Sequence, residues 1–497
     1  MRKLLYSLLG LFLIGCGSET LQTEPSDKKA ELNFLEETKL LIEPSQEFVE
    51  AAKTQFSTSH SGRCQPMSGP AFQANYNFPE TVPDVKNTPW EDIDFKTSPE
   101  EYMRAVLAQA VSDNDGNDWN VRDAENGWYH APWMHTIREP YRGLTRERGS
   151  RRGHLHEQQT ETQENWAIGY YNDIAAVTFS DIWADRSIPQ SAKVEFAENS
   201  ATIKLLFTEA DAEDAPYLTN PKTWNACLFD SRNGTHRMAN MNLLQIDIGV
   251  KVGLSNSPTG WIMGTFVYWN EDADTDFSWE NMKAVSLHWG NDPELTLSKF
   301  KAGERPQEGW TNTFFDEQFG RIRDAAGVSN MNEKLLTLGL FGRANGPVDN
   351  PLSACLACHA RAIDPGQSLP SRSFNEAAPF AISDITKDEE ITNLFFRNLE
   401  PNEPFVEGWH SLDYSLQAAV GLRAYRRWVF QNYREYDCVL TDQDDLPNPA
   451  LCPAGSKLMD KAAENAPLMR SPVDASSDSI IDDRDETGDP RSGIFTK

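Results

Sequence analysis

Three residues in the C-terminal half of the chain stand close enough together for joint chemistry. Cys355 and Cys358 are separated by two residues, and His359 follows at once. On a turn of helix, residues three and four apart share a face, so the two thiols and the imidazole can act on one partner. With 7 Cys and 9 His in 497 residues, roughly 0.002 copies of this pattern are expected by chance. Composition therefore does not explain the grouping.

The spacing is that of a c-type haem attachment site. Each sulfur can form a thioether with a haem vinyl group, while the adjacent imidazole ligates the iron. We therefore expect one covalently attached haem c on Cys355 and Cys358, with His359 as the proximal ligand. A redox dithiol, half of a zinc site and an ordinary disulfide are the alternatives. A second Cys or His pair with zinc-site spacing is missing from the sequence, and a loop from Gly342 to Pro351 precedes the motif where a redox dithiol would follow a strand.

The ligand on the other side of the iron decides what such a haem does. A protein ligand favours electron transfer, whereas an open position favours ligand binding or catalysis. The methionines after the motif are Met459 and Met469, in or beside a polar tail. His410 is the sixth ligand that we name, against the alternative of a surface or capping histidine. Further candidates, if the β-rich part of the chain covers the haem, are Met263, His130, His135, His154 and His156.

The first residues of the chain predict export. Two basic residues precede an apolar run from Leu4 to Ile14, which is too short to stay in a membrane as a spanning helix. The run ends in Leu-Ile-Gly-Cys and resembles the lipobox of bacterial lipoproteins. This resemblance implies cleavage of a signal peptide at 1–15 and lipidation of Cys16, and Gly17 after the cysteine implies the outer membrane of a Gram-negative cell. An ordinary cleaved signal peptide with a spare thiol is the alternative.

Export and haem attachment support each other, since c-type haem is attached outside the cytoplasm. We expect the protein at the periplasmic face of the outer membrane or at the cell surface, held to the membrane by its lipid anchor alone. The formal net charge is −29, which repels nucleic acid and favours a redox partner with a basic docking surface, although solubility is the simpler reason for the charge.

The remaining cysteines are Cys64, Cys227, Cys438 and Cys452, an even number in a disulfide-permissive compartment. Cys438 and Cys452 flank a short polar loop, which favours a disulfide between them and leaves Cys64 to pair with Cys227. Four cysteines allow three pairings, so the connectivity stays open.

Residues from about 165 to 290 have the periodicity of strands. From Leu244 to Val252, apolar residues alternate with polar or small ones, and Ile203 to Phe207 repeats this pattern. The segment from Trp261 to Trp269 is apolar on both faces, which is typical of a central strand. Loops join these segments, so we expect an antiparallel sheet or sandwich.

The order of these strands ahead of the motif resembles the β-sheet cytochromes of the P-four-sixty and c-prime-beta superfamily. The similarity rests on Ala201–Phe207, Ile246–Val252 and Thr259–Phe266. It implies a monohaem protein of nitrogen-oxide chemistry. The lysine that cross-links haem in the P-four-sixty members has no counterpart near Thr208 and Glu209, so a cross-linked haem is not expected.

Helical periodicity surrounds the motif. Pro99 to Val111 predicts an earlier helix, and Thr386 with Glu389 forms a capping-box pattern ahead of another. Apolar residues at four-residue steps from Leu412 to Trp428 predict a longer helix with one apolar stripe. Helices on both sides of the motif resemble a small class I c-type cytochrome.

The predicted fold is α+β. It comprises a signal peptide at 1–15, a lipid-anchored tether at 16–65, an antiparallel β-rich domain at 66–300, a helical cytochrome c-like haem domain at 301–440 and an acidic, largely disordered tail at 441–497. We expect a monohaem c-type cytochrome that transfers electrons. The alternatives are a haem enzyme or gas-binding protein, with an open iron acting on small nitrogen oxides, oxygen or peroxide, and a binding lipoprotein with a structural haem. The sequence names no catalytic acid or base.

Overall fold

The computed structural model of the protein describes residues 46–56, 64, 71–84, 88–122, 126–135, 137–192, 194–230, 235–315, 317–318, 339–364, 385, 388–435 and 460–461. The predictions for Cys16, Cys438, Cys452, Met459 and Met469 fall outside these ranges. Among the described residues, no helix combines the length and the apolar character that crossing a membrane requires.

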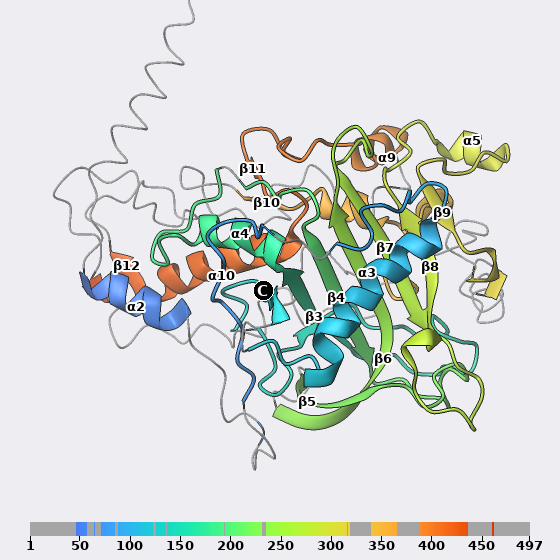
Figure 1. The fold of residues 1–497 in the computed structure, drawn as a ribbon, viewed down its shortest axis with the longest axis horizontal. Coiled ribbons are helices and arrows are strands. Elements are labelled where there is room, and N and C mark those ends of the chain that lie inside the picture. Colours follow the sequence, from blue (N-terminus) through green and yellow to red (C-terminus); the bar gives the residue numbers. More distant parts are fainter. Residues whose placement is uncertain are drawn as a thin grey trace, which may run out of the picture.

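A nine-stranded antiparallel sheet forms the centre of the molecule (Figure 1). Its main order is β1-β3-β4-β6-β7-β8-β9, with β2 added to β3 and β5 added to β6. The strands are β1 (Trp128–Tyr129), β2 (Thr145–Arg146), β3 (Asn165–Asn172), β4 (Ala201–Thr208), β5 (Thr223–Asp230), β6 (Thr235–Lys251), β7 (Trp261–Tyr268), β8 (Met282–His288) and β9 (Gly309–Thr311). The predicted antiparallel sheet is therefore confirmed.

The longest strand, β6, has two different halves. Its first half pairs with β5 as a ribbon and is largely exposed, whereas its second half lies between β4 and β7 and is buried. The alternation from Leu244 to Val252 predicts this second half. Every residue of β7 is buried, which confirms the expectation of a central strand covered on both faces.

One face of the sheet is covered by α3 (Pro99–Asn114), which crosses the strands in Figure 1. Met103 and Val106 of α3 join Ile246 and Phe266 of the sheet in one apolar core. Gly264 allows this close approach, since a Cβ there would lie 3.0 Å from the Cε atom of Met103. The helix predicted from Pro99 to Val111 is confirmed, and it continues to Asn114.

The opposite face is covered by helices that come late in the chain. A second core joins Tyr171, Trp261 and Met263 of the sheet to Leu356 beside the cysteine motif and to Leu422. The described residues therefore form a mixed α and β structure in which these helices pack on the sheet itself, and they show no separate helical haem domain. The helices are α2 (Gln46–Phe56), α3 (Pro99–Asn114), α4 (Asp173–Ile182), α5 (Leu297–Lys301), α7 (Cys355–His359), α9 (Glu389–Phe395) and α10 (Leu416–Asn432).

Two helix predictions need correction. The N-cap of α9 is Asp388, whose carboxylate accepts a hydrogen bond from the Glu390 backbone N–H at 2.8 Å. The helix begins at Glu389, directly after this cap, and not two residues earlier as the predicted capping box requires; Thr386 itself lies outside the described residues. In α10 the predicted apolar stripe packs against the second core, as expected, but its residues are only partly buried.

The buried stripe of α10 lies to one side of the predicted one. Its most buried residues are Ala418, Leu422, Tyr425 and Val429. A four-residue step advances by more than one helical turn, so a stripe at such steps drifts around the helix. The sequence therefore located the helix and a stripe that contacts the core, but not the residues that are buried most.

Short elements complete the described structure. Two-stranded ribbons pair β10 (Ile363–Asp364) with β11 (His410–Ser411) and β12 (Tyr433–Glu435) with β13 (Asp460–Lys461). A disulfide joins Cys64 to Cys227 on β5, with the two Cα atoms 5.9 Å apart, which is the favoured one of the pairings that the sequence allows. The disulfide ties the segment before the sheet to its exposed ribbon.

Candidate haem site

The motif forms a single helical turn against the sheet. Cys355 and His359 begin and end α7, which packs on β7. Cys355 is half-buried and Cys358 is buried, and neither thiol is in a disulfide. The helical turn brings both sulfurs to one side, because residues three apart share a face. Two free thiols beside an imidazole are the groups that covalent haem attachment uses.

The two thiols do not have the character of a redox pair. Burial raises the pKa of both Cys355 and Cys358, and the charges of Asp349 and Asp247 raise that of Cys355 further. A redox dithiol needs a lowered pKa, because the thiolate is the nucleophile. Among the described residues, no three His, Cys, Asp or Glu side chains gather as a metal site, so the zinc alternative gains no support either.

The imidazole of His359 is held by the backbone. Its Nδ1 atom lies 2.9 Å from the carbonyl oxygen of Tyr414, to which it donates in the neutral ring. Burial lowers the pKa of His359 to about 4, so the ring is neutral near pH 7. A neutral imidazole with Nδ1–H bonded to a carbonyl presents the Nε2 lone pair to a metal, as metal-binding histidines do.

Tyr414 is presented by an unusual piece of backbone. Asp413 and Tyr414 have φ values of 46° and 66°, in the left-handed region, which costs on the order of 1–3 kcal/mol for each residue other than glycine. Such a conformation persists only where the surroundings hold it. The contacts of the Asp413 side chain provide this restraint.

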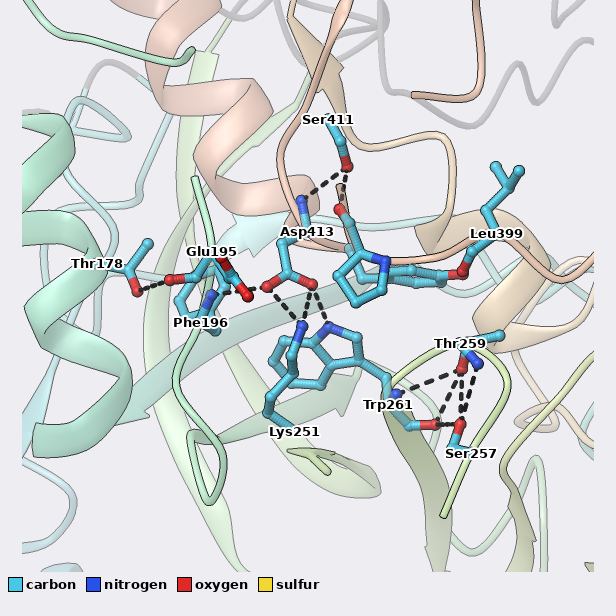
Figure 2. Close-up of polar contacts among 12 residues, drawn as sticks. Thr178, Glu195, Phe196, Lys251, Ser257, Thr259, Trp261, Leu399, Ser411 and Asp413 are labelled. Atoms are coloured by element: carbon cyan, nitrogen blue, oxygen red, sulfur yellow. Dashed lines mark hydrogen bonds and ion pairs between the residues drawn. The ribbon is translucent and has the colours of Figure 1, made fainter. Parts of the chain in front are cut away.

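The Asp413 carboxylate binds three groups that come from distant segments (Figure 2). Lys251 Nζ lies 2.7 Å from both oxygens, and Trp261 Nε1 donates to Oδ1 at 2.6 Å. The backbone N–H of Phe196 donates to Oδ2 at 2.7 Å. Asp413 is fully buried, so these bonds replace water. Two sheet strands, through Lys251 and Trp261, thereby fix the backbone that orients His359.

Burial and pairing act in opposite directions on this ion pair. Burial raises the pKa of Asp413 and lowers that of Lys251, while the attraction between the two charges opposes both shifts. The carboxylate also accepts two N–H hydrogen bonds, which favour its charged form. Both groups can therefore stay charged in this buried site, because the ion pair and the hydrogen bonds replace their contacts with water.

A partly buried polar patch lies on the sheet near Cys355. Asp247 accepts hydrogen bonds from Thr265 Oγ1 at 2.9 Å and from Gln245 Nε2 at 2.8 Å, and its other oxygen lies 3.4 Å from Lys204 Nζ. Gln245 also donates to Asp349 at 3.1 Å. The loop before the motif is thus anchored to the sheet by polar contacts.

His410, the predicted sixth ligand, lies in a polar cluster. It stands on β11, opposite Asp364 of β10. The strand β10 follows His359 by a few residues in the chain. Its Nδ1 atom lies 3.0 Å from Ser191 Oγ, and Ser191 and Arg426 both bind Asp364. The short β10–β11 ribbon brings His410 into the neighbourhood of the motif. Iron ligation by His410 stays a prediction.

The other histidines named from the sequence have local partners. His130 Nδ1 accepts from the Asn75 N–H at 3.1 Å, and His135 Nε2 lies 3.0 Å from Gln55 Nε2. His154 and His156 accept hydrogen bonds from backbone N–H groups within three residues of themselves. These contacts hold the four rings to segments other than α7.

One histidine next to the motif was not considered from the sequence. His288 ends β8, is 3% exposed, and its Nε2 atom has no hydrogen-bond partner among the described residues. Burial lowers its pKa to about 3, and the charge of His359 contributes to this lowering. No sequence spacing relates His288 to the motif; only the pairing of the strands brings the two histidines together.

Met263 lies beside His288 in the sheet. The two residues are register partners on β7 and β8, and Met263 is buried in the core that contains Leu356. These two strands therefore lie on the side of the sheet on which α7 packs.

Comparison of the chain with protein-family models, with curated proteins and with solved structures found no significant match.

Proposed function

We propose that the protein is an exported, lipid-anchored monohaem c-type cytochrome that works in electron transfer. The observation that carries this proposal is the arrangement of α7. Its two free thiols stand beside a histidine whose Nδ1 donates to the Tyr414 carbonyl and whose Nε2 is left to bind a metal. This is the donor set of a c-type haem with its proximal ligand.

Each residue near the motif would have a distinct part in holding the haem. Cys355 and Cys358 would form the thioethers and His359 would ligate the iron. Arg361 is a buried guanidinium whose charge lowers the pKa of Cys358, and it is suited to pair with a haem propionate. The bound haem would supply one-electron redox chemistry at its iron.

The cell location and the partner follow from the sequence. The signal peptide at 1–15 would export the chain to the compartment where c-type haem is attached, and lipidation of Cys16 would leave a lipid anchor there. The net charge of −29 would draw a redox partner with a basic docking surface, in a salt-dependent encounter.

A first experiment tests covalent attachment. The full chain is produced with the c-type haem maturation system, separated on a denaturing gel and stained for haem. We expect a haem-stained band and a mass increase of one haem, both lost in Cys355→Ala with Cys358→Ala. The matched control, Cys64→Ser with Cys227→Ser, removes the other described pair and should keep the haem. A wild-type chain without covalent haem would refute the proposal.

The role of the haem is tested by its spectrum. Sharp low-spin bands in the reduced protein that carbon monoxide leaves unchanged are expected for electron transfer with a filled sixth position. A high-spin iron that binds carbon monoxide would instead support the gas-binding or enzymatic alternative.

A further inference from the structure

His288 is a buried side chain with an unused metal-binding atom. It is 3% exposed, and its Nε2 has no hydrogen-bond partner among the described residues. Buried polar atoms in folded proteins are nearly always partnered, so an orphan of this kind points to a missing partner. The partner of a histidine ring nitrogen can be a water molecule, a polar group or a metal.

The sheet register directs His288 toward the motif. Leu287, its neighbour, packs in the core with α3, and side chains alternate along a strand, so His288 lies on the opposite face. Its register partner Met263 belongs to the core with Leu356 of α7. His359 ends α7, which packs on β7, and β7 pairs with the strand β8 that His288 ends.

The tautomer of His288 matches that of His359. A hydrogen bond with the backbone of Gly290 raises the pKa of His288, which is the effect of a carbonyl that accepts from the ring. Because Nε2 has no partner, the donor is Nδ1, and the lone pair remains on Nε2. His359 has the same arrangement with the Tyr414 carbonyl, and such bonds set the orientation of metal-binding histidines.

The strand on the other side of His288 leaves the ring uncovered by a side chain. Its register partner on β9 is Gly309, and a Cβ at that position would lie 3.0 Å from the Cβ of His288. The ring is therefore flanked within the sheet by Met263 on one side and by bare backbone on the other.

We propose that His288 supplies the second axial ligand of the haem held by Cys355 and Cys358, opposite His359. This inference rests on the proposed function and names the ligand that completes the iron. It favours His288 over His410, because His288 has a buried Nε2 atom without a hydrogen-bond partner among the described residues, whereas His410 belongs to the polar cluster of Ser191 and Asp364. A bis-histidine haem is six-coordinate and suited to electron transfer.

The test uses the matured full-length protein and reads the iron itself. Near-infrared magnetic circular dichroism and electron paramagnetic resonance of the ferric wild type are expected to give the signature of two imidazoles. His288→Ala is expected to become high-spin and to bind carbon monoxide, with the low-spin spectrum restored by added imidazole. His288→Met is expected to give histidine–methionine ligation, with its long-wavelength charge-transfer band.

Three variants serve as matched controls. His130→Ala removes another buried histidine with an unpartnered Nε2, and His410→Ala and Met263→Leu remove the competing ligands. All three should keep the bis-histidine signature. A wild type with methionine ligation, or loss of the low-spin spectrum in His410→Ala alone, would overturn the inference.

The two proposals fail in different ways. A wild type with covalent haem but a five-coordinate iron, or a His288→Ala protein with an unchanged spectrum, would overturn the His288 assignment and leave haem attachment intact. A wild type without a haem-stained band would remove both. Since the wild-type spectrum alone reports two imidazoles, a variant that fails to fold does not prevent the decision.

Discussion

Asp413 is the residue on which the orientation of His359 most directly depends. Its carboxylate binds Lys251 and Trp261 from the sheet, and the residue after it offers the carbonyl that holds the His359 ring. The ion pair is buried, with 6% and 0% of the two side chains exposed. Such a pair contributes little when compared with an apolar replacement, but breaking it from one side is expensive.

Asp413→Asn tests this dependence. The change leaves the Lys251 ammonium buried without its counter-charge, so we expect the free energy of unfolding to fall by about 3–5 kcal/mol. Urea denaturation of the full chain, followed by tryptophan fluorescence, measures the loss. The matched double variant, Lys251→Met with Asp413→Asn, removes both charges and should recover part of it. An unchanged denaturation midpoint in Asp413→Asn would contradict the assignment.

Contacts between individual residues of the site were the part of the structure that the sequence predicted least. The motif itself was found because its three members are adjacent in the chain. The Tyr414 carbonyl and the Nε2 atom of His288 are brought to the motif by strand pairing and by a left-handed turn. Neither leaves a local pattern of residue types, so sequence reasoning named His410 and did not consider His288.

At the scale of elements, α10 shows how closely the late helices are fitted to the sheet side of the molecule. A Cβ on Gly421 in its middle would lie 2.5 Å from the Pro132 carbonyl oxygen. A glycine inside a helix costs about 1 kcal/mol relative to alanine. This cost accompanies a backbone contact that no other residue allows.

Gly421→Ala sets helix propensity against this contact. Propensity alone would stabilise the protein by about 1 kcal/mol, but a methyl group against rigid backbone forces the helix to shift, which costs about 1–3 kcal/mol. We expect a net loss of stability in thermal unfolding. Ala419→Gly in the same helix is the control and should cost about 1 kcal/mol through propensity. A Gly421→Ala protein more stable than wild type would refute the close contact.

Elements with strong short-range periodicity were predicted well. The alternation in β4 and β6, the two-sided burial of β7 and the helix α3 all follow from local patterns. The order of the strands and the buried side of α10 do not, because they depend on contacts between distant segments. The cap of α9 failed for a simpler reason, since Asp388 competes as a nearer acceptor.

At the scale of the whole molecule, the disulfide connects parts of the chain that are far apart. Cys64 and Cys227 are separated by 163 residues. Closing so long a loop restricts the unfolded chain, and removing a native disulfide typically costs about 2–5 kcal/mol. The bond also agrees with the predicted export, because disulfides persist in oxidising compartments.

Reduction should therefore lower the thermal unfolding midpoint of the full chain. We expect a clear downward shift when a thiol reductant is added, measured by circular dichroism. In Cys64→Ser with Cys227→Ser, the midpoint should already be low and the reductant should lower it by much less than in the wild type. An equal response of that variant to reductant would assign the stabilisation to other cysteines.

The two faces of the sheet also differ in how well they tolerate water. The α3 face is apolar, whereas the face under the motif carries Lys204, Asp247 and Thr265 beside the apolar residues of the second core. Cys358 is buried in the finished fold, so a haem joined to its sulfur would have to be attached before this side of the molecule closes. Polar side chains on the sheet can stay hydrated until the haem is attached. Folding would then proceed in a fixed order. The strands would pair first, and α7 with its haem would pack on the sheet last.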